Sequence, residues 1–245
     1  MSKNFELLQR AQQEQESMTR ARSGGGNSTL RTKSDHSADE ESIRLVQRVF
    51  LVPGPDSPRV VVFTGVDAGD GCTTVCGRVA ETLAGEMGVS GSFCAVDANL
   101  RSPSLHRYFG LENRTGLVDA VSQPGPVREF VQQSGNSRLW VMTAGSAASN
   151  IHSLLTSEGL AARVAELRSE FDHVLIDSPA VNQFADPVAL GKLADGVILV
   201  LQSNATRREA ARKAKEIIEA GRIRLLGAVL NKRRYPVPAG IYGKL

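Results

Sequence analysis

Short apolar runs alternate with amphipathic segments along most of the chain, and this alternation limits the possible folds more than any other feature. The runs are of strand length and mostly uninterrupted, which is typical of strands buried on both faces. We expect strands at Val60–Phe63, Phe93–Val96, Leu139–Met142, Val174–Ile176, Val197–Leu201 and Leu225–Leu230. Between them we expect helices at Thr73–Glu86, Leu117–Val121, Val127–Gln132, Leu160–Ser169 and Ala205–Ala220. Strands alternating with helices predict an α/β fold, a mainly parallel doubly wound sheet with helices on both faces.

Residues 1–40 differ in composition from everything after them. They contain no Val or Ile, six Ser and three consecutive Gly. Such a segment buries too little apolar surface to offset the entropy lost on ordering, so we expect it to be disordered or partly helical. Within it, Asn4–Gln15 carries apolar residues three apart, and is either a frayed solvated tail or a helix that docks on a partner.

The overall composition bounds the class of protein. Of the 245 residues, 41% are hydrophobic and 22% are charged, and the formal net charge is +3. These values are ordinary for a globular protein and give no charge argument for a nucleic-acid partner. The sequence has neither a run of ~18 apolar residues nor an apolar leader, so we expect a cytoplasmic protein. We place the folded domain at 41–232, beginning with a helix at 43–50, and a basic tail at 233–245.

A glycine-rich loop, residues 64–74, joins the first expected strand to the first helix after it. This arrangement aims free backbone N–H groups at a phosphate, and Gly69 and Gly71 permit positive φ and close backbone approach. The loop departs from the P-loop pattern at Val66, where the pattern has Gly, and at Cys72, where it has Lys. By analogy with losing one preorganised donor, the missing Lys costs about 2–4 kcal/mol of transition-state stabilisation. Nucleotide binding can therefore survive where catalysis does not. The alternative interpretation of the whole loop is a tight strand-to-helix turn that binds no ligand.

Two Asp residues come at the ends of expected strands. Asp97 ends the strand that begins at Phe93, and Asp177 follows the strand at 174–176. Ligands bind beyond the carboxyl ends of the strands in such sheets, so both carboxylates and the Thr73 hydroxyl are candidates to hold Mg²⁺. The alternative for either carboxylate is a helix cap or a loop-ordering role.

Five segments in the same order resemble the bacterial tyrosine autokinases of capsule and exopolysaccharide synthesis, within the larger group of deviant P-loop ATPases. The resemblance covers the chain from about residue 41 onward. The matching segments are 69–74, 96–103 with His106 and 109–111, 174–179, 194–200 and 226–231.

This resemblance implies a kinase-like domain at 41–232 that binds ATP or ADP together with Mg²⁺. The residues implied to contact the nucleotide are Gly69, Gly71, Cys72, Thr73 and Thr74 at the phosphates and Asn231 near the adenine. Those implied to organise Mg²⁺ are Thr73, Asp97 and Asp177, of which the two Asp are also the candidate catalytic residues. Members of the family phosphorylate tyrosines in their own C-terminal tail, which here holds Tyr235 and Tyr242.

The resemblance also implies a partner and a location. The family works beside a membrane-embedded polysaccharide co-polymerase that controls chain length, which implies a peripheral position at the inner face of the plasma membrane. The segment Glu41-Ser42-Ile43-Arg44 is similar to the Glu-x-x-Arg helix through which the family forms rings, although Arg48, the second basic residue, comes one position late. A homo-oligomer is therefore a further expectation.

Three departures from the family pattern bear on activity. Cys72 replaces the phosphate Lys, Asn99 replaces the second acid of an Asp-x-Asp motif, and the tail carries two tyrosines rather than a cluster. An amide cannot accept a proton from a tyrosine hydroxyl. We therefore expect a nucleotide-binding regulator of exopolysaccharide or capsule synthesis that is catalytically weak or inactive. One alternative is an active tyrosine autokinase with a substitute cation, for which Arg207 and Arg208 are candidates; another is a spatial-organising partition-type ATPase.

The three cysteines are an odd number and too few for a disulfide scaffold. Cys72 stands at a helix start, where a thiol pKa is often lowered, so it is either a redox-sensitive thiolate or a small residue that fills a tight turn.

Overall fold

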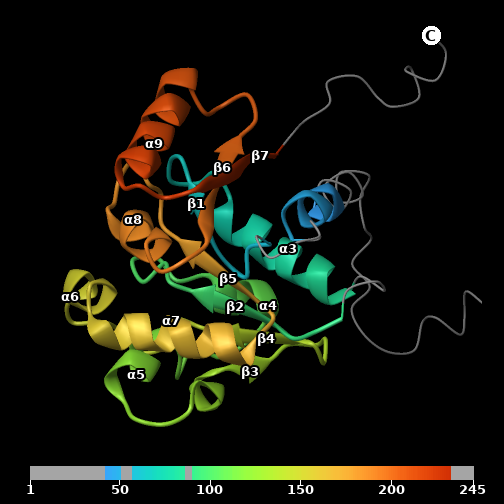
Figure 1. Cartoon of the computed structure of the whole chain (residues 1–245), viewed down its shortest axis with the longest axis vertical. Helices are drawn as coiled ribbons and strands as arrows, with labels where there is room; N and C mark the ends of the chain where they lie inside the picture. The colour runs from blue at the N-terminus through green and yellow to red at the C-terminus, as the bar shows by residue number, and fades with distance from the viewer. Residues whose placement is uncertain (1–41, 51–56, 86–89, 233–245) are drawn as a thin grey trace, which may run out of the picture. The chain divides into compact units, whose positions relative to one another are not determined.

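The computed structural model describes residues 42–50, 57–85 and 90–232, which form a seven-stranded sheet between helices (Figure 1). The strand order is β3-β4-β2-β5-β1-β6-β7, and every neighbouring pair is parallel except β3 with β4. The strands are β1 (Val60–Gly65), β2 (Phe93–Asp97), β3 (Gln132–Gln133), β4 (Leu139–Met142), β5 (His173–Ser178), β6 (Gly196–Gln202) and β7 (Leu225–Asn231). The predicted fold class is confirmed. The segment 1–40 and the tail 233–245, with Tyr235 and Tyr242, lie outside the described residues.

Helices flank both faces of this sheet. Their bounds are α3 (Cys72–Gly85), α4 (Leu105–Phe109), α5 (Leu117–Ser122), α6 (Ile151–Leu155), α7 (Glu158–Glu170), α8 (Asp186–Gly191) and α9 (Arg208–Ala220), with a 3₁₀ helix η1 (Val127–Phe130). Residues 42–49 are also helical, as the sequence predicts to within one residue. Within the described ranges, no helix is both long and apolar enough to cross a membrane.

The central strand β1 separates two hydrophobic cores by the alternation of its side chains. Val60 and Val62 belong to the core under α5, α7, α8 and α9, whereas Val61 and Phe63 belong to the core under α3 and the helix at 42–49. All six residues of β1 are buried, so the continuous apolar run follows from burial on both faces. The parallel strands that flank β1 end at the same edge as β1, where the chain turns into α3. That edge carries the candidate site.

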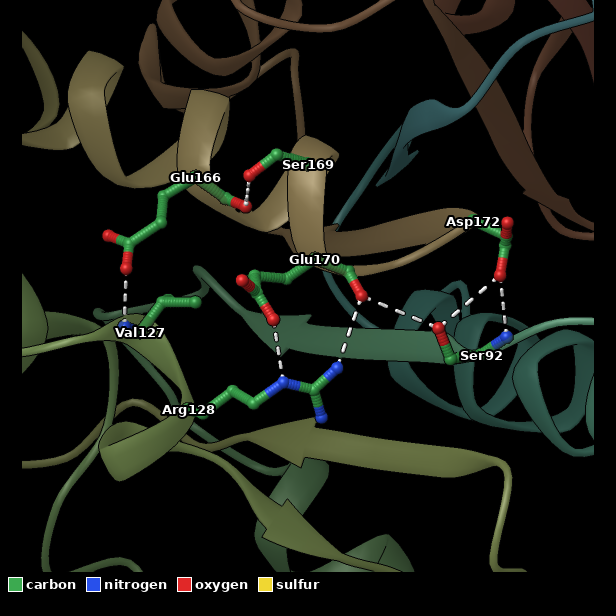
Figure 2. Close-up of polar contacts among 7 residues, drawn as sticks. All are labelled: Ser92, Val127, Arg128, Glu166, Ser169, Glu170 and Asp172. Atoms are coloured by element: carbon green, nitrogen blue, oxygen red, sulfur yellow. Dashed lines mark hydrogen bonds and ion pairs between the residues drawn. The ribbon is translucent and has the colours of Figure 1, made fainter.

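The helix expected at 127–132 is wrong at its last two residues. The structure has η1 there, and the chain then extends at Val131 and pairs antiparallel with β4. Figure 2 shows contacts that join η1 to α7: the Val127 N–H donates to Glu166 Oε1 at 2.6 Å, and Arg128 Nε donates to Glu170 Oε2 at 2.6 Å. Hydrophobic periodicity reports only on neighbouring residues, so it cannot predict these contacts with a segment about 40 residues away.

Helix α9 begins three residues later than expected. The N–H groups of Ala205 and Thr206 both donate to the Gln202 carbonyl, and Thr206 Oγ1 accepts from the Gln202 N–H at 2.8 Å. These bonds close a turn after β6, so the helical backbone starts only at Arg208.

Candidate functional site

The glycine-rich loop between β1 and α3 is held in a fixed curve by backbone conformation and by its own side chains. Gly69 and Gly71 have φ of +89° and +85°, in the region that side-chain-bearing residues rarely adopt. Asp70 Oδ2 accepts from the Asp67 N–H at 2.9 Å, which ties the two ends of the turn together. The expectation that Gly69 and Gly71 permit a positive φ is therefore confirmed.

The end of β7 braces the loop from outside. Asn231 Nδ2 donates to the Asp70 carbonyl at 2.8 Å, and Lys232 Nζ donates to the Gly69 carbonyl at 2.6 Å. A Cβ atom at Gly71 would overlap the Asn231 amide. Asn231 thus stabilises the loop although it lies about 160 residues away in the sequence. Its expected position near an adenine stays a prediction.

A chain of oxygen atoms lies beneath the loop at the start of α3. Thr73 Oγ1 donates to Asp177 Oδ2 at 2.5 Å, and Ser104 Oγ donates to Thr73 Oγ1 at 3.0 Å. Asp177 Oδ1 is buried and has no hydrogen-bond partner among the described residues. A buried carboxylate oxygen without a partner is costly unless something else satisfies it.

Asp97 and Asp177 are register partners at the ends of adjacent strands β2 and β5. Burial raises the pKa of Asp177 to about 7, and the charge of Asp97 adds to this rise. Burial also raises the pKa of Asp97, against the hydrogen bonds that the carboxylate accepts from the backbone. Two carboxylates forced close together in a buried place favour a cation between or beside them.

Asp97 has a second role that the sequence left as an alternative. Its Oδ2 accepts from the N–H groups of Ser104 and Leu105, both at 2.9 Å, at the first turn of α4. Its Oδ1 accepts from the Asn99 N–H at 3.2 Å. Asp97 therefore caps α4 and orders the loop after β2, whatever else it binds.

The residues at this edge fit Mg²⁺. Thr73 offers a hydroxyl oxygen, Asp177 a carboxylate oxygen without a partner, and Asp97 a second carboxylate nearby, and all of these are the hard ligands that Mg²⁺ prefers. The described residues hold no cluster of three or more His, Cys, Asp or Glu side chains of the kind that binds a metal without help. A Mg²⁺ ion here would share its coordination with water and phosphate oxygens, as it usually does at nucleotide sites.

The Cys72 thiol does not have the lowered pKa that one interpretation of the sequence required. Burial raises the pKa of Cys72 well above its ordinary value, and the neighbouring Asp177 charge raises it further. Burial likewise raises the pKa of Cys76, one turn along α3. This direction argues against the interpretation of Cys72 as a thiolate, because desolvation beside a carboxylate favours the neutral thiol.

A cavity of about 510 Å³ opens beside the loop. Its wall includes the loop itself, with Gly69, Gly71, Cys72, Thr73 and Thr74, and reaches residues that follow β2 and β5. Five of the six residues predicted to contact nucleotide therefore line one cavity, and Asn231 stands behind the loop.

Arg101 is the residue that the sequence analysis missed. It is the only Lys, Arg or His among the described residues that line the cavity, whereas the expected substitutes, Arg207 and Arg208, do not line it. Arg101 pairs with Asp186, 85 positions later. The signal available in the sequence was its place four residues after Asp97, within the segment that matches the family.

Comparisons with known proteins identify relatives of the chain and structures with the same fold. No family model matches the chain. The tyrosine-protein kinase YwqD of Bacillus subtilis is 33% identical over 174 residues, which are 71% of this chain and 72% of YwqD. The crystal structure of the chimerical protein CapA2B2 is 26% identical, with a TM-score of 0.71 over 84% of this chain and 87% of that one.

A more distant likeness concerns the fold alone. The septum site-determining protein MinD from Pyrococcus horikoshii, solved with Mg-ADP, has a TM-score of 0.59 at 18% identity, covering 76% of each chain. Together with the identity and coverage of YwqD, these findings place the chain: it belongs to the bacterial tyrosine-protein kinase family, and its fold is that of the related P-loop ATPases.

Proposed function

We propose that this chain is a kinase-like, nucleotide-binding regulator of exopolysaccharide or capsule synthesis in which phosphoryl transfer is weak or absent. The observation that carries the proposal is the Thr73–Asp177 pair at a glycine-rich phosphate loop that lacks its Lys, with one Asp177 oxygen that has no hydrogen-bond partner among the described residues.

Binding of ATP or ADP is supported by the loop and its cavity. Backbone N–H groups at the start of α3 are free to meet phosphate oxygens, because the first turn of a helix leaves its N–H groups without helical partners. Mg²⁺, when bound, would neutralise phosphate charge. Thr73 and Asp177 would hold the ion. Asp97 would stabilise the end of β2 beside them, because its carboxylate accepts hydrogen bonds from the first turn of α4.

Weak transfer is supported by two residues in the site. Cys72 lines the cavity where the pattern has Lys, and its raised pKa keeps it a neutral thiol. Asn99 also lines the cavity, and its Oδ1 accepts from the Ser102 N–H at 3.3 Å. Asn99 therefore acts in a turn and offers no base to remove a proton from a tyrosine hydroxyl.

The partner and the location are inferred from relatives. The chimerical structure is named CapA2B2, and a tyrosine-protein kinase called CpsD from Streptococcus agalactiae is 26% identical over 84% of this chain. We extend this to a membrane-embedded polysaccharide co-polymerase as the partner, with this chain peripheral at the inner face of the plasma membrane. A homo-oligomer through the helix at 42–49 belongs to the same proposal.

An active tyrosine autokinase is the second candidate. The relatives' names favour it, and so does Arg101, a cation in the cavity wall that can offset the missing Lys. Tyr235 and Tyr242 would be the acceptors. A partition-type ATPase is the least supported, because such proteins carry a second Lys at the start of the phosphate loop, where this chain has Gly65-Val66-Asp67.

The test is a calorimetric titration of the full chain with ATP and ADP, each with and without Mg²⁺. The proposal predicts Mg²⁺-dependent binding that Thr73→Val weakens, because the variant loses the hydroxyl beside Asp177. Thr82→Val is the matched control, since Thr82 lies on the same helix and donates to the Arg78 carbonyl away from the site. Absence of binding by the wild-type chain, or equal binding by the Thr73→Val and Thr82→Val variants, would contradict the proposal.

A further inference from the structure

The cavity beside the phosphate loop has a wall that is short of positive charge. Asp67 and Asp70 line it together with neutral residues, and Arg101 is the only cation among its described lining residues. A polyphosphate brings several negative charges into such a space, and repulsion by nearby carboxylates must be offset by donors and cations. With Cys72 neutral, the guanidinium of Arg101 is the one positive side chain of the described wall.

Contacts with Asp186 and Phe184 hold the Arg101 side chain in position. Its Nε donates to Asp186 Oδ2 at 2.8 Å and its Nη2 donates to Asp186 Oδ1 at 3.0 Å, a two-point ion pair in which the Asp186 side chain is 5% exposed. The guanidinium also lies 4.2 Å from the centre of the Phe184 ring, and Phe184 lines the cavity. These contacts fix the plane of the guanidinium before any ligand arrives.

The same contacts leave part of the guanidinium available. The pair with Asp186 uses one edge of the group, and Nη1 has no hydrogen-bond partner among the described residues. The Arg101 side chain is 35% exposed, so it is neither sealed in the core nor free in solvent. An arginine fixed on one edge and open on another is suited to bind a phosphate oxygen, because little side-chain entropy is then lost on binding.

We propose that Arg101 is the cation that binds the terminal phosphates of the nucleotide, taking over charge that Cys72 does not supply, and that Asp186 and Phe184 position it. This inference rests on the proposed nucleotide binding. It assigns to Asp186, which lies outside the cavity wall, the role of a positioning residue for Arg101.

The test is titration of the full chain and its variants with Mg·ATP, ADP and AMP. Arg101→Gln should lower the affinity for ATP by about 10- to 100-fold, the size of a lost charge-assisted hydrogen bond, and should change the affinity for AMP by less than about 2-fold. Arg114→Gln is the matched control, since Arg114 is 82% exposed and pairs with Glu112 away from the cavity. It should leave all three affinities at the wild-type level.

Thermal unfolding without nucleotide shows whether each variant folds. If Arg101→Gln does not fold, Asp186→Asn serves instead, because it keeps the guanidinium and loosens its position. We expect this variant to lose ATP affinity several-fold and to keep its AMP affinity. An unchanged ratio of ATP to AMP affinity in a folded variant would overturn the inference and leave the proposed function standing. Absence of nucleotide binding by the wild-type chain would overturn both.

Discussion

Asp177→Asn should change how the stability of the protein depends on pH. Burial and the charge of Asp97 raise the pKa of Asp177 from its ordinary 3.8 to about 7. The folded chain then holds a proton that the unfolded chain releases between these two values. In wild type, Asp177 therefore contributes stability that is present below about pH 4 and is lost as the pH rises through 7. The side chain of Asn does not titrate in this range, so the free energy of unfolding of the variant does not fall in this way as the pH rises.

The magnitude follows from the same two pKa values. Between about pH 5.5 and pH 8 the shift corresponds to a loss of about 2 kcal/mol in the wild-type free energy of unfolding, at about 1.4 kcal/mol for each pH unit below 7. The difference in stability, variant minus wild type, should rise by that amount over this interval. Comparing the two proteins cancels the pH dependence of the groups whose titration Asp177 does not influence.

The assay is urea unfolding of both proteins, without nucleotide or divalent cation, at several pH values across this interval. Glu216→Gln is a control for the chemistry of the substitution, because Glu216 lies on the exposed side of α9. We expect its stability difference from wild type to stay flat. An equally flat difference for Asp177→Asn would refute the reasoning, because it would mean that Asp177 is charged in the folded protein throughout.

Three further predictions concern the loop. Cys72→Lys should raise the affinity for Mg·ATP by about 10- to 100-fold, the size of one added charge-assisted hydrogen bond, and an unchanged affinity in a titration would show that the missing Lys does not limit binding. Gly71→Ala should lower the free energy of unfolding by about 1–3 kcal/mol, because its φ is +85° and the new Cβ meets the Asn231 amide. The control Gly85→Ala, at the end of α3 with open space around it, should cost little in the same urea experiment. The Cys72 thiol should react with a disulfide reagent at neutral pH more slowly than a free thiol, because its pKa is raised; a faster reaction would restore the thiolate interpretation.

The main strands and long helices were predictable because their sequence signal is local. A run such as Val60–Phe63 has one explanation, a strand buried on both faces, and the structure has β1 there with all its residues buried. The short helices α4, α6 and α8 were not predicted, although α5, which also has six residues, was. A segment of five or six residues gives too little hydrophobic periodicity for its helix to be predicted regularly. The early end of the helix expected at 127–132 was also missed, because contacts with Glu166 and Glu170 on α7 hold this segment.

The same distinction between local and long-range signals applies to the candidate site. The loop and the strand-end carboxylates Asp97 and Asp177 were found from motif and topology, since parallel strands deliver their carboxyl ends to one edge. The role of Arg101 depends on Asp186, and the brace formed by Asn231 depends on the loop carbonyls. Both are contacts between segments far apart in the sequence, and no spacing rule predicts them.

The central claim is that the site binds nucleotide yet transfers phosphate poorly, and the most direct measurement is phosphotyrosine formed on the full wild-type chain at saturating Mg·ATP. Saturation is first established by titration, and phosphate per chain is then counted by mass spectrometry over time. We predict that nearly all chains hold nucleotide while only a small fraction acquires phosphotyrosine. Stoichiometric phosphate on Tyr235 or Tyr242 would contradict the account and establish an active autokinase.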